Sequence, residues 1–518
     1  MTDDLQPEDS RGNLGLGHRV TRGLTWTVVH TWGGQVLSLL VFVILARLLT
    51  PDEFGLVALA MVFVALAQLI VDQGLGDALI QRIEIGPDHV DSAFWVAVVT
   101  GAVLTLVGVL VAIPISIALR EPELIPILQV LSVTFLLSAF SSIPIALLTR
   151  ALEFRLLAIR TLLAIVGGGV VGVTLALTGF GAWALVGQQV AAAVLSAAML
   201  WAVTPWRPRL HASRRAVGEL FPFGVRVMGS DILGFVSRNA DNLLVGIFLG
   251  TVPLGIYSVG YRILDTSQRL LINVARKVTF PALSRLQHDA DRLERAYVRI
   301  LRQASVVILP GYVGLALVAP ELTVTLFGTR WAESGPVAAV LFLSGPVLAL
   351  QAFSGSLLYA LGRADVVLRF RVITAVANVT GFVLALPLGI VAVAAAFTIR
   401  GYLLLPLLLR WTSRSAGVRA ADHATATRAA MLATAVMAGV VLGVKLLAVD
   451  RIESGTLLGA EILAGAVAFA AALWLADRSL MIETWTVARA TLPRRRASGA
   501  IGDGRHAVAD REPPNHEA

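Results

Sequence analysis

The chain carries about fourteen apolar segments, each long enough to cross a lipid bilayer as a helix of roughly 20 residues. Inside lipid, every backbone polar group must be satisfied within the protein, so only helices or closed barrels span it. The chain is 57% hydrophobic and 15% charged, which excludes an ordinary soluble globule. We therefore expect an all-α polytopic membrane protein. The predicted spans are 24–46, 54–76, 93–119, 124–148, 157–178, 181–203, 221–249, 254–275, 301–320, 334–361, 366–389, 390–411, 428–449 and 456–476.

Arginine is distributed unevenly over the connections between these segments. If the N-terminus is cytoplasmic and the spans alternate, the connections predicted to lie outside hold only Arg47, Arg120, Arg330 and Arg451. The connections predicted to lie inside hold most of the other arginines, in clusters at 150–160, 204–220, 276–302, 363–371, 410–428 and 494–496. Cytoplasmic loops of membrane proteins carry such an excess of Arg and Lys. The pattern predicts an even number of spans and two cytoplasmic termini.

A weak internal repeat divides the chain into two halves. TPDEFGLVALA at 50–60 matches GTVPLGIYSVG at 250–260, and both are short turns that close in an apolar residue followed by Gly. Parallel repeats of this kind occur in transporters whose substrate site lies between the repeats. We expect two six-helix lobes around a central cavity, followed by two C-terminal helices. The predicted parts are a cytoplasmic tail (1–23), a first lobe (24–203), a basic cytoplasmic linker (204–220), a second lobe (221–411), two further helices with their preceding loop (412–476) and a cytoplasmic, partly disordered tail (477–518).

The predicted helical hairpin at 221–276 carries seven charged side chains at membrane depth. They are Arg226, Asp231, Arg238 and Asp241 on the first limb, and Arg262, Asp265 and Arg269 on the second. A charge inside the bilayer is costly unless it faces protein, water or a partner, so such residues are candidates for function. At 1.5 Å per residue, the limbs place Arg238 level with Asp265 and Asp241 level with Arg262. Arg262–Asp265 and Asp265–Arg269 also have the spacing of helical neighbours.

Two interpretations of the hairpin are compatible. In the first, opposite charges fix the register of the two limbs. In the second, the four arginines form a cationic cavity wall, because guanidinium groups bind phosphate oxygens well. The carboxylates would then hold the arginines until an anionic ligand displaces them.

Other polar residues within the apolar segments are candidates of lower specificity. His30 could titrate near neutral pH, although such a residue is more often a packing residue. Asp72 lies near the inner end of the second predicted span, where it could be interfacial. Arg400 lies near the middle of the twelfth span, where it could contact a phosphate or extend to the membrane surface.

Several chemistries have no support in the sequence. The chain has no cysteine, its eight histidines are scattered, and it has no GxxxxGK[ST] motif. We therefore expect no metal, no cofactor and no ATP hydrolysis. A net charge of +8 would suggest nucleic acid in a soluble protein, but here the arginines follow the topology, so no nucleic acid partner is expected. The predicted outer loops are too short for a catalytic site, and we do not expect an enzyme.

Three stretches resemble a known family. They are VILARLLTPDEFGLVALAMVFVALAQLIVDQGLGDALIQR, ALLTRALEFRLLAIR, and NADNLLVGIFLGTVPLGIYSVGYRILDTSQRLLINVARKVTFPALSRLQHD. These stretches look like the polysaccharide transporter family, the Wzx-type branch of the multidrug/oligosaccharidyl-lipid/polysaccharide exporter superfamily. The similarity covers most of residues 20–410 and is greatest to colanic-acid-exporter-like "lipopolysaccharide biosynthesis protein" members.

The resemblance implies a flippase of the bacterial cytoplasmic membrane. Such a protein turns an undecaprenyl-diphosphate-linked glycan from the inner to the outer leaflet by alternating access, and cationic cavity residues are thought to hold the diphosphate. Its expected partners are the lipid-linked glycan, membrane lipids, and polysaccharide polymerase or chain-length machinery. Two alternatives remain. One is a cation-coupled antiporter of small molecules, which would use Asp72, Asp231, Asp241 and Asp265. The other is a membrane glycan ligase or polymerase.

Overall fold

The computed structural model describes residues 33–72, 74–448 and 453–491, and in these ranges every regular element is a helix. Within them, eleven helices are long and apolar enough to cross a membrane. Of the other predicted spans, the first falls partly on a shorter apolar helix, Gly34–Leu48, and two fall on the helices that carry the charged hairpin. The membrane-protein fold predicted from hydropathy is confirmed, and fourteen spans are consistent with it.

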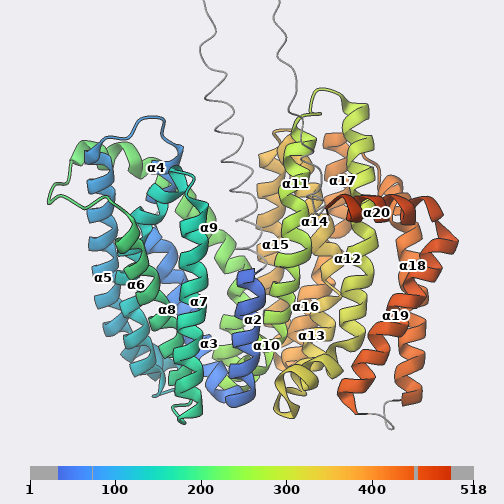
Figure 1. Cartoon of the computed structure of the whole chain (residues 1–518), viewed down its shortest axis with the longest axis horizontal. Coiled ribbons are helices and arrows are strands. Elements are labelled where there is room, and N and C mark those ends of the chain that lie inside the picture. The colour runs from blue at the N-terminus through green and yellow to red at the C-terminus, as the bar shows by residue number, and fades with distance from the viewer. Residues whose placement is uncertain (1–32, 73, 449–452, 492–518) are drawn as a thin grey trace, which may run out of the picture.

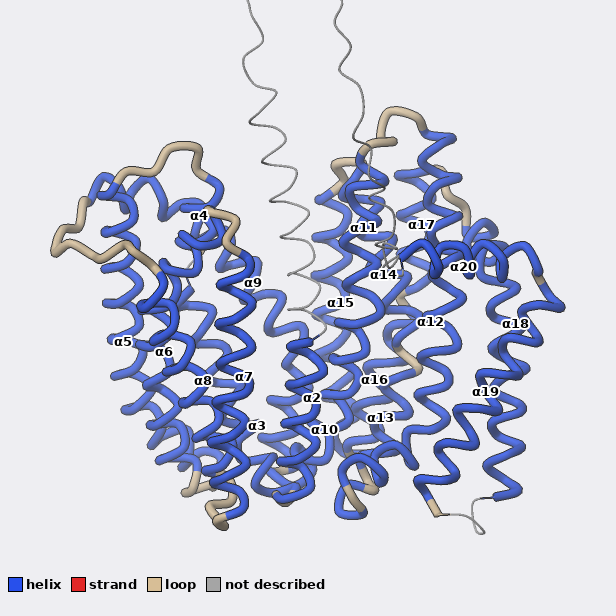
Figure 2. Tube along the Cα trace, viewed as in Figure 1, coloured by secondary structure: helices blue, strands red, loops and turns tan. Residues whose placement is uncertain are grey.

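The helices form two lobes that lie side by side (Figures 1 and 2). The first lobe contains α2 (Gly34–Leu48), α3 (Pro51–Asp72), α4 (Leu75–Gln81), α5 (Pro87–Leu119), α6 (Leu124–Arg150), α7 (Phe154–Leu177) and α8 (Trp183–Val203). The second contains α9 (Arg214–Leu249), α10 (Thr251–Ser267), α11 (Asn273–Ser284), α12 (Ala290–Phe327), α13 (Ser334–Phe342), α14 (Gly345–Ala360), α15 (Ala364–Ala385), α16 (Ile390–Leu403) and α17 (Leu405–Ala416). The long helices α18 (Ala420–Ala448) and α19 (Ser454–Ala476) pack on α12, and the short helix α20 (Arg478–Thr491) follows them.

The two ends of the helix bundle differ in their connections. One end of the bundle, which we call the basic end, contains the linker 204–213 and the turns 151–153, 285–289, 361–363 and 417–419. The other end, which we call the opposite end, contains the turns 49–50, 120–123, 178–182, 328–333 and 386–389. In Figure 1 the basic end is at the top of the picture. Within the described residues, the arginine-rich connections predicted from the sequence therefore lie together at one end of the molecule.

Helix α9 joins the lobes, because it packs on α3, α4 and α5 of the first lobe and on α10 and α15 of the second. Near its start, the Glu219 carboxylate forms ion pairs with Arg82, with Arg215 (3.1 Å) and with the His89 ring (3.3 Å). Hydrogen bonds from His89, Arg82 and Arg215 lower the pKa of Glu219 to about 2. The beginning of the second lobe is thus held against the first lobe at the basic end.

At the opposite end, α3 and α10 cross in close contact. A Cβ atom added at Gly55 would overlap the carbonyl oxygen of Thr251, and one added at Gly255 would overlap that of Pro51. These residues are related by the 200-residue offset of the internal repeat, so the repeat-related turns lie face to face. The Thr251 hydroxyl also donates to the Asp52 carboxylate (2.5 Å). Only glycine permits so close an approach of the two backbones.

Further contacts seal this end between the lobes. Arg47 donates to the carbonyl oxygens of Leu326 (2.7 Å) and Thr325 (2.6 Å) at the end of α12. The Trp331 indole N–H donates to the Ala46 carbonyl oxygen (2.7 Å). The rings of Phe42, Phe54, Phe327 and Trp331 pack edge to face around these bonds. The two lobes are therefore closed against each other at the opposite end.

Candidate functional site

A cavity of about 510 Å³ lies between the lobes. The first lobe supplies most of its wall, and α10 of the second lobe supplies Ser258 and Arg262. These two residues are four positions apart, so they share one face of α10. The remaining lining residues come from α2, α3, α7 and α8: Ser38, Phe42, Phe54, Val57, Ala58, Met61, Arg160, Thr161, Ala164, Ile165, Leu185, Gln188, Gln189, Ala192 and Ser196.

Arg262, one of the predicted cavity arginines, reaches across from the second lobe to the first. Its guanidinium donates to the Ser38 hydroxyl (2.8 Å) and lies 5.6 Å from the centre of the Phe42 ring. Its Nε atom is buried and has no hydrogen-bond partner. A buried donor without a partner is costly, so an acceptor brought within reach of this N–H would be stabilising.

Arg160 of α7 is a second guanidinium in the wall. One of its terminal nitrogens donates to the Thr161 hydroxyl (3.2 Å), whereas its Nε is buried without a partner. Arg160 and Ser196 also line a smaller cavity of about 210 Å³. The other residues of this smaller cavity are Gln68, Leu137, Ser138, Ser141, Ser142, Ile145 and Ala193. Arg160 therefore lines both the central cavity, which has two arginines in its wall, and the smaller cavity, which is rich in serine.

Asp265 and Arg269 form the ion pair predicted from their spacing. The Arg269 Nε lies 2.9 Å from the Asp265 Oδ2, and both side chains are partly exposed. Arg269 belongs to a single π-helical turn, Gln268–Ile272, that follows α10. Asp265 also lies within electrostatic range of Arg262. The second limb of the charged hairpin therefore holds its carboxylate between two arginines.

Asp241 is oriented differently from the prediction. It is 1% exposed and accepts hydrogen bonds from the Tyr257 hydroxyl (2.7 Å) and the Asn242 backbone N–H (2.9 Å). The pairing of Asp241 with Arg262 expected from their equal depth is wrong, because Tyr257 and Arg262 are five residues apart and face opposite sides of α10. Depth along a helix does not fix the direction in which a side chain points.

Arg400 of α16 is also buried inside the second lobe. Its guanidinium lies 4.9 Å from the centre of the Phe397 ring, and it is within electrostatic range of Asp241 and Tyr261. Its Nε has no hydrogen-bond partner. Arg400 does not line either of the two cavities described above. Asp241 and Arg400 together form a buried polar cluster behind the cavity wall.

The other predicted candidates cannot be placed in this way. His30 precedes the first described residue. Arg226, Asp231 and Arg238 belong to α9, and Asp72 ends α3, but their side chains lie outside the described residues. The predicted pairing of Arg238 with Asp265 therefore stays a prediction.

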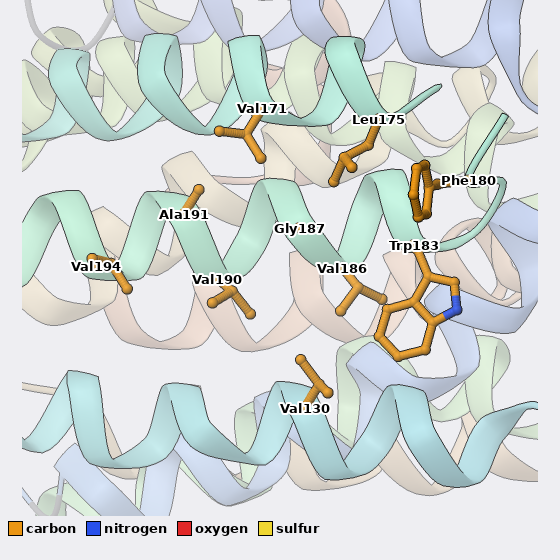
Figure 3. Close-up of a pocket in the computed structure, with 10 residues that line it drawn as sticks. All are labelled: Val130, Val171, Leu175, Phe180, Trp183, Val186, Gly187, Val190, Ala191 and Val194. Atoms are coloured by element: carbon orange, nitrogen blue, oxygen red, sulfur yellow. The ribbon is translucent and has the colours of Figure 1, made fainter. Parts of the chain in front are cut away.

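A third pocket, of about 620 Å³, lies in the first lobe and has an entirely apolar lining (Figure 3); we call it the apolar groove. Its residues come from α6, α7, α8 and the turn between the last two: Val130, Val171, Leu175, Phe180, Trp183, Val186, Gly187, Val190, Ala191 and Val194. On α8, Val186 and Val190 face this groove, whereas Gln188 and Gln189 face the central cavity. Helix α8 therefore separates an apolar groove from a polar cavity.

The lining of the central cavity determines which ligands it suits. Among the described residues that line it, two are cationic, several carry amides or hydroxyls, and none is acidic. Guanidinium groups bind phosphate oxygens, while amide and hydroxyl groups bind the hydroxyls of sugars. The cavity is therefore suited to an anionic, hydroxyl-rich molecule.

Arg160 is the site residue that sequence reasoning missed. In the sequence it belongs with the arginines of the basic connection 150–160, and only the fold brings α7 to the cavity. One signal could have identified it: Arg160 lies six residues inside α7. That places it about 9 Å along the helix from its start. Gln188 and Gln189 carry a similar signal, because they are adjacent amide side chains within a predicted apolar span.

Known proteins resemble this chain in sequence and in fold. The family model described as "Polysaccharide biosynthesis protein" matches residues 44–336. The succinoglycan biosynthesis transport protein ExoT of Rhizobium meliloti (strain 1021) is 30% identical over 69% of this chain and 73% of its own length. The lipopolysaccharide biosynthesis protein WzxC of Escherichia coli (strain K12) is 26% identical over 69% of this chain and 73% of its own length. The solved structure of the lipid II flippase MurJ, in an inward closed conformation, covers 88% of this chain and 100% of its own, with a TM-score of 0.72 and 14% identity.

Proposed function

The chain belongs to the polysaccharide biosynthesis protein family, and we propose that it moves an undecaprenyl-diphosphate-linked oligosaccharide across the cytoplasmic membrane. A relative at 30% identity is named a transport protein for succinoglycan biosynthesis, and the fold matches that of a lipid II flippase. The observation that carries the proposal is the pair of arginines, Arg160 and Arg262, that line one cavity from two different lobes.

The diphosphate binds between these arginines. Both Nε groups are buried and unpartnered, so a phosphate that accepts from them relieves an unmade hydrogen bond on each side. Arg262 exchanges its bond to the neutral Ser38 hydroxyl for one to an anionic phosphate oxygen, which is stronger. Because the two arginines belong to different lobes, a bound diphosphate draws the lobes together around it.

The sugars nearest the diphosphate occupy the smaller serine-rich cavity and the amides of α8. Gln68 donates to Ser138 there, and Ser141, Ser142 and Ser196 supply further hydroxyls. The lipid tail stays in the bilayer, where the apolar groove on the other face of α8 offers a surface for hydrocarbon. This arrangement separates the polar head of the substrate from its tail by one helix.

The structure corresponds to the state that accepts substrate from the cytoplasm. The arginine-rich connections at the basic end are the kind found on the cytoplasmic side, which supports an orientation with both termini inside. The opposite end is closed by the α3–α10 crossing and by Arg47 and Trp331. Release to the outer leaflet requires these contacts to separate while the basic end closes, which is alternating access. A polysaccharide polymerase or chain-length machinery would then take the product.

Two other functions fit the cavity less well. A multidrug antiporter for cationic compounds needs exposed carboxylates, but the described lining of the cavity carries arginines and no acidic residue. A glycan ligase or polymerase needs catalytic groups in outer loops, and the turns at the opposite end are short. We therefore assign transport and no catalytic step to this chain.

An export assay tests the proposal. A strain that lacks the chain is complemented with wild type, with the Arg160→Ala/Arg262→Ala double variant, or with Arg330→Ala, an exposed arginine at the opposite end. We expect the double variant to abolish polysaccharide export, and mass spectrometry to find the lipid-linked oligosaccharide accumulating in its cells. Arg330→Ala is expected to export normally. Normal export by the double variant, at wild-type protein levels, would exclude the proposed diphosphate site.

A further inference from the structure

Glu461 is the most anomalous titratable residue outside the cavity. It lies in the first half of α19, its exposed fraction is 0%, and neither carboxyl oxygen has a hydrogen-bond partner. Its neighbours on α19 include the buried residues Leu457, Leu458 and Gly465. An ionised carboxylate in such a place loses its hydration and gains no donor, which is strongly unfavourable, whereas a protonated carboxyl is far less costly.

Two charged residues on the adjacent helices lie within electrostatic range of Glu461. They are Glu321 of α12 and Lys445 of α18. The Lys445 ammonium is already engaged, because it binds Glu321 Oε2 (2.8 Å) and the Leu317 carbonyl oxygen (2.9 Å). The ion pair neutralises one carboxylate and leaves the second without a counter-charge. One proton would balance the cluster.

A metal cation fits this cluster less well than a proton. The described residues contain no group of three or more His, Cys, Asp or Glu side chains that could hold a metal ion. A cation in this site would also meet the Lys445 ammonium, which occupies the space beside Glu321. Asp450 and Arg451, between α18 and α19, lie outside the described residues.

The cluster adjoins the contacts that close the opposite end. Glu321 follows Pro320, which supplies no backbone N–H, and precedes Thr325 and Leu326 by about one turn of α12. The carbonyl oxygens of Thr325 and Leu326 accept the bonds from Arg47 of the first lobe. A change in the packing of α19 on α12 therefore acts on the segment that holds the two lobes together.

We propose that Glu461 is a proton-binding site, that its protonated form stabilises the closed opposite end, and that loss of the proton favours opening. In the closed arrangement the carboxyl is fully buried and lacks donors, so it must be neutral. When the proton leaves, the carboxylate requires water or a donor, and α19 must move away from α12 to provide either. The proton would thereby couple a site in the two C-terminal helices to the opening between the lobes.

Chemical labelling tests whether Glu461 carries a proton. Dicyclohexylcarbodiimide reacts with protonated carboxyl groups in apolar surroundings, and mass spectrometry of the purified full chain locates the adduct. We expect an adduct on Glu461 that is lost in Glu461→Gln and that declines as the pH is raised. The exposed Glu453, at the start of α19, serves as an internal reference that remains unlabelled. A folded protein in which Glu461 is unlabelled at every pH would overturn the proposal.

A distance measurement tests the coupling to closure. The chain has no cysteine, so Phe180→Cys and Thr329→Cys introduce two unique spin-label positions, one in each lobe at the opposite end. We expect a short distance at low pH and a growing fraction of longer distances as the pH rises. Glu461→Gln should keep the short distance at all pH values, and Glu461→Asp should retain the pH dependence. Distances that do not respond to pH, or that respond equally in Glu461→Gln, would refute the coupling.

Because this measurement needs no substrate, it is independent of the proposed transport function. If the arginine variants export normally but the distances follow Glu461, the diphosphate site is wrong and the proton site stands. If the arginine variants lose export but the distances do not depend on Glu461, the proton site is wrong and the diphosphate site stands.

Discussion

Gly55 of α3 lies directly against the carbonyl oxygen of Thr251 at the start of α10, with no room for a Cβ atom. The repeat-related contact, Gly255 against Pro51, has the same geometry. The two halves of the chain thus meet through matching turns at the opposite end. This pair of contacts makes closure of that end depend on two glycines.

Replacing either glycine with alanine should prevent the opposite end from closing. The added Cβ of Gly55→Ala or Gly255→Ala would overlap backbone, which cannot move aside as a side chain can. We expect loss of export, and longer distances between spin labels at Phe180→Cys and Thr329→Cys. Gly439→Ala is the matched control, because Gly439 lies within helix α18 and has no neighbour within 4 Å of an added Cβ. Short distances in Gly55→Ala would contradict this account of closure.

The buried Asp241 carboxylate should depend on Tyr257 for stability. Tyr257→Phe removes the donor at 2.7 Å and leaves a carboxylate oxygen buried without it. We expect the variant to be destabilised by about 1–3 kcal/mol, as for other buried groups that lose a partner. Thermal unfolding of the purified protein in detergent measures this, and Tyr359→Phe, at a tyrosine that is 41% exposed, is the control. Equal losses of stability in both variants would indicate that the hydrogen bond from Tyr257 to Asp241 does not stabilise the fold.

The ion pairs of Glu219 should hold α9 to the first lobe over a wide pH range. Hydrogen bonds from His89, Arg82 and Arg215 lower the pKa of Glu219 to about 2, whereas an unperturbed glutamate has a pKa of about 4.3. A lowered pKa means that the stabilising contribution is complete above about pH 4.3 and is lost as the pH falls through about 2.

Hydrogen exchange of the linker 204–213 measures this attachment. At about pH 4 the wild-type linker should remain protected, because the folded-state carboxylate is still ionised there. Glu219→Gln should be less protected at the same pH and should show little change on further acidification. Arg209→Gln, which removes a nearby exposed charge of opposite sign that forms no ion pair with Glu219, is a control for a general response to altered charge. Identical protection in wild type and Glu219→Gln would rule out the predicted role of these ion pairs.

Hydropathy and arginine placement were sufficient to predict the fold. Long apolar segments can only be helices in lipid, and the arginine-rich connections that the structure describes fall together at one end of the molecule. The local pair Asp265–Arg269 was also predictable, because helical spacing alone brings side chains four residues apart together.

The composition of the cavity wall was less predictable. The pairing of Asp241 with Arg262 failed because equal depth leaves the rotation of each helix about its axis undetermined. Asp241 instead faces Tyr257. Arg160 was missed because its part in the site depends on the packing of α7 beside α2 and α8, which is a tertiary property. The local sequence indicates how deep a residue lies along its helix, but only the packed fold determines the direction in which its side chain points.

The central claim is that Arg160 and Arg262 bind a lipid diphosphate together, and its most direct test is the affinity of the purified protein for undecaprenyl diphosphate. Native mass spectrometry in detergent can compare wild type, Arg160→Ala, Arg262→Ala and the control Arg330→Ala. Each lost charge-assisted hydrogen bond costs about 1.5–3 kcal/mol. We therefore expect each cavity variant to bind roughly 10- to 100-fold more weakly, and Arg330→Ala to bind like wild type. Wild-type affinity in both cavity variants would contradict the account.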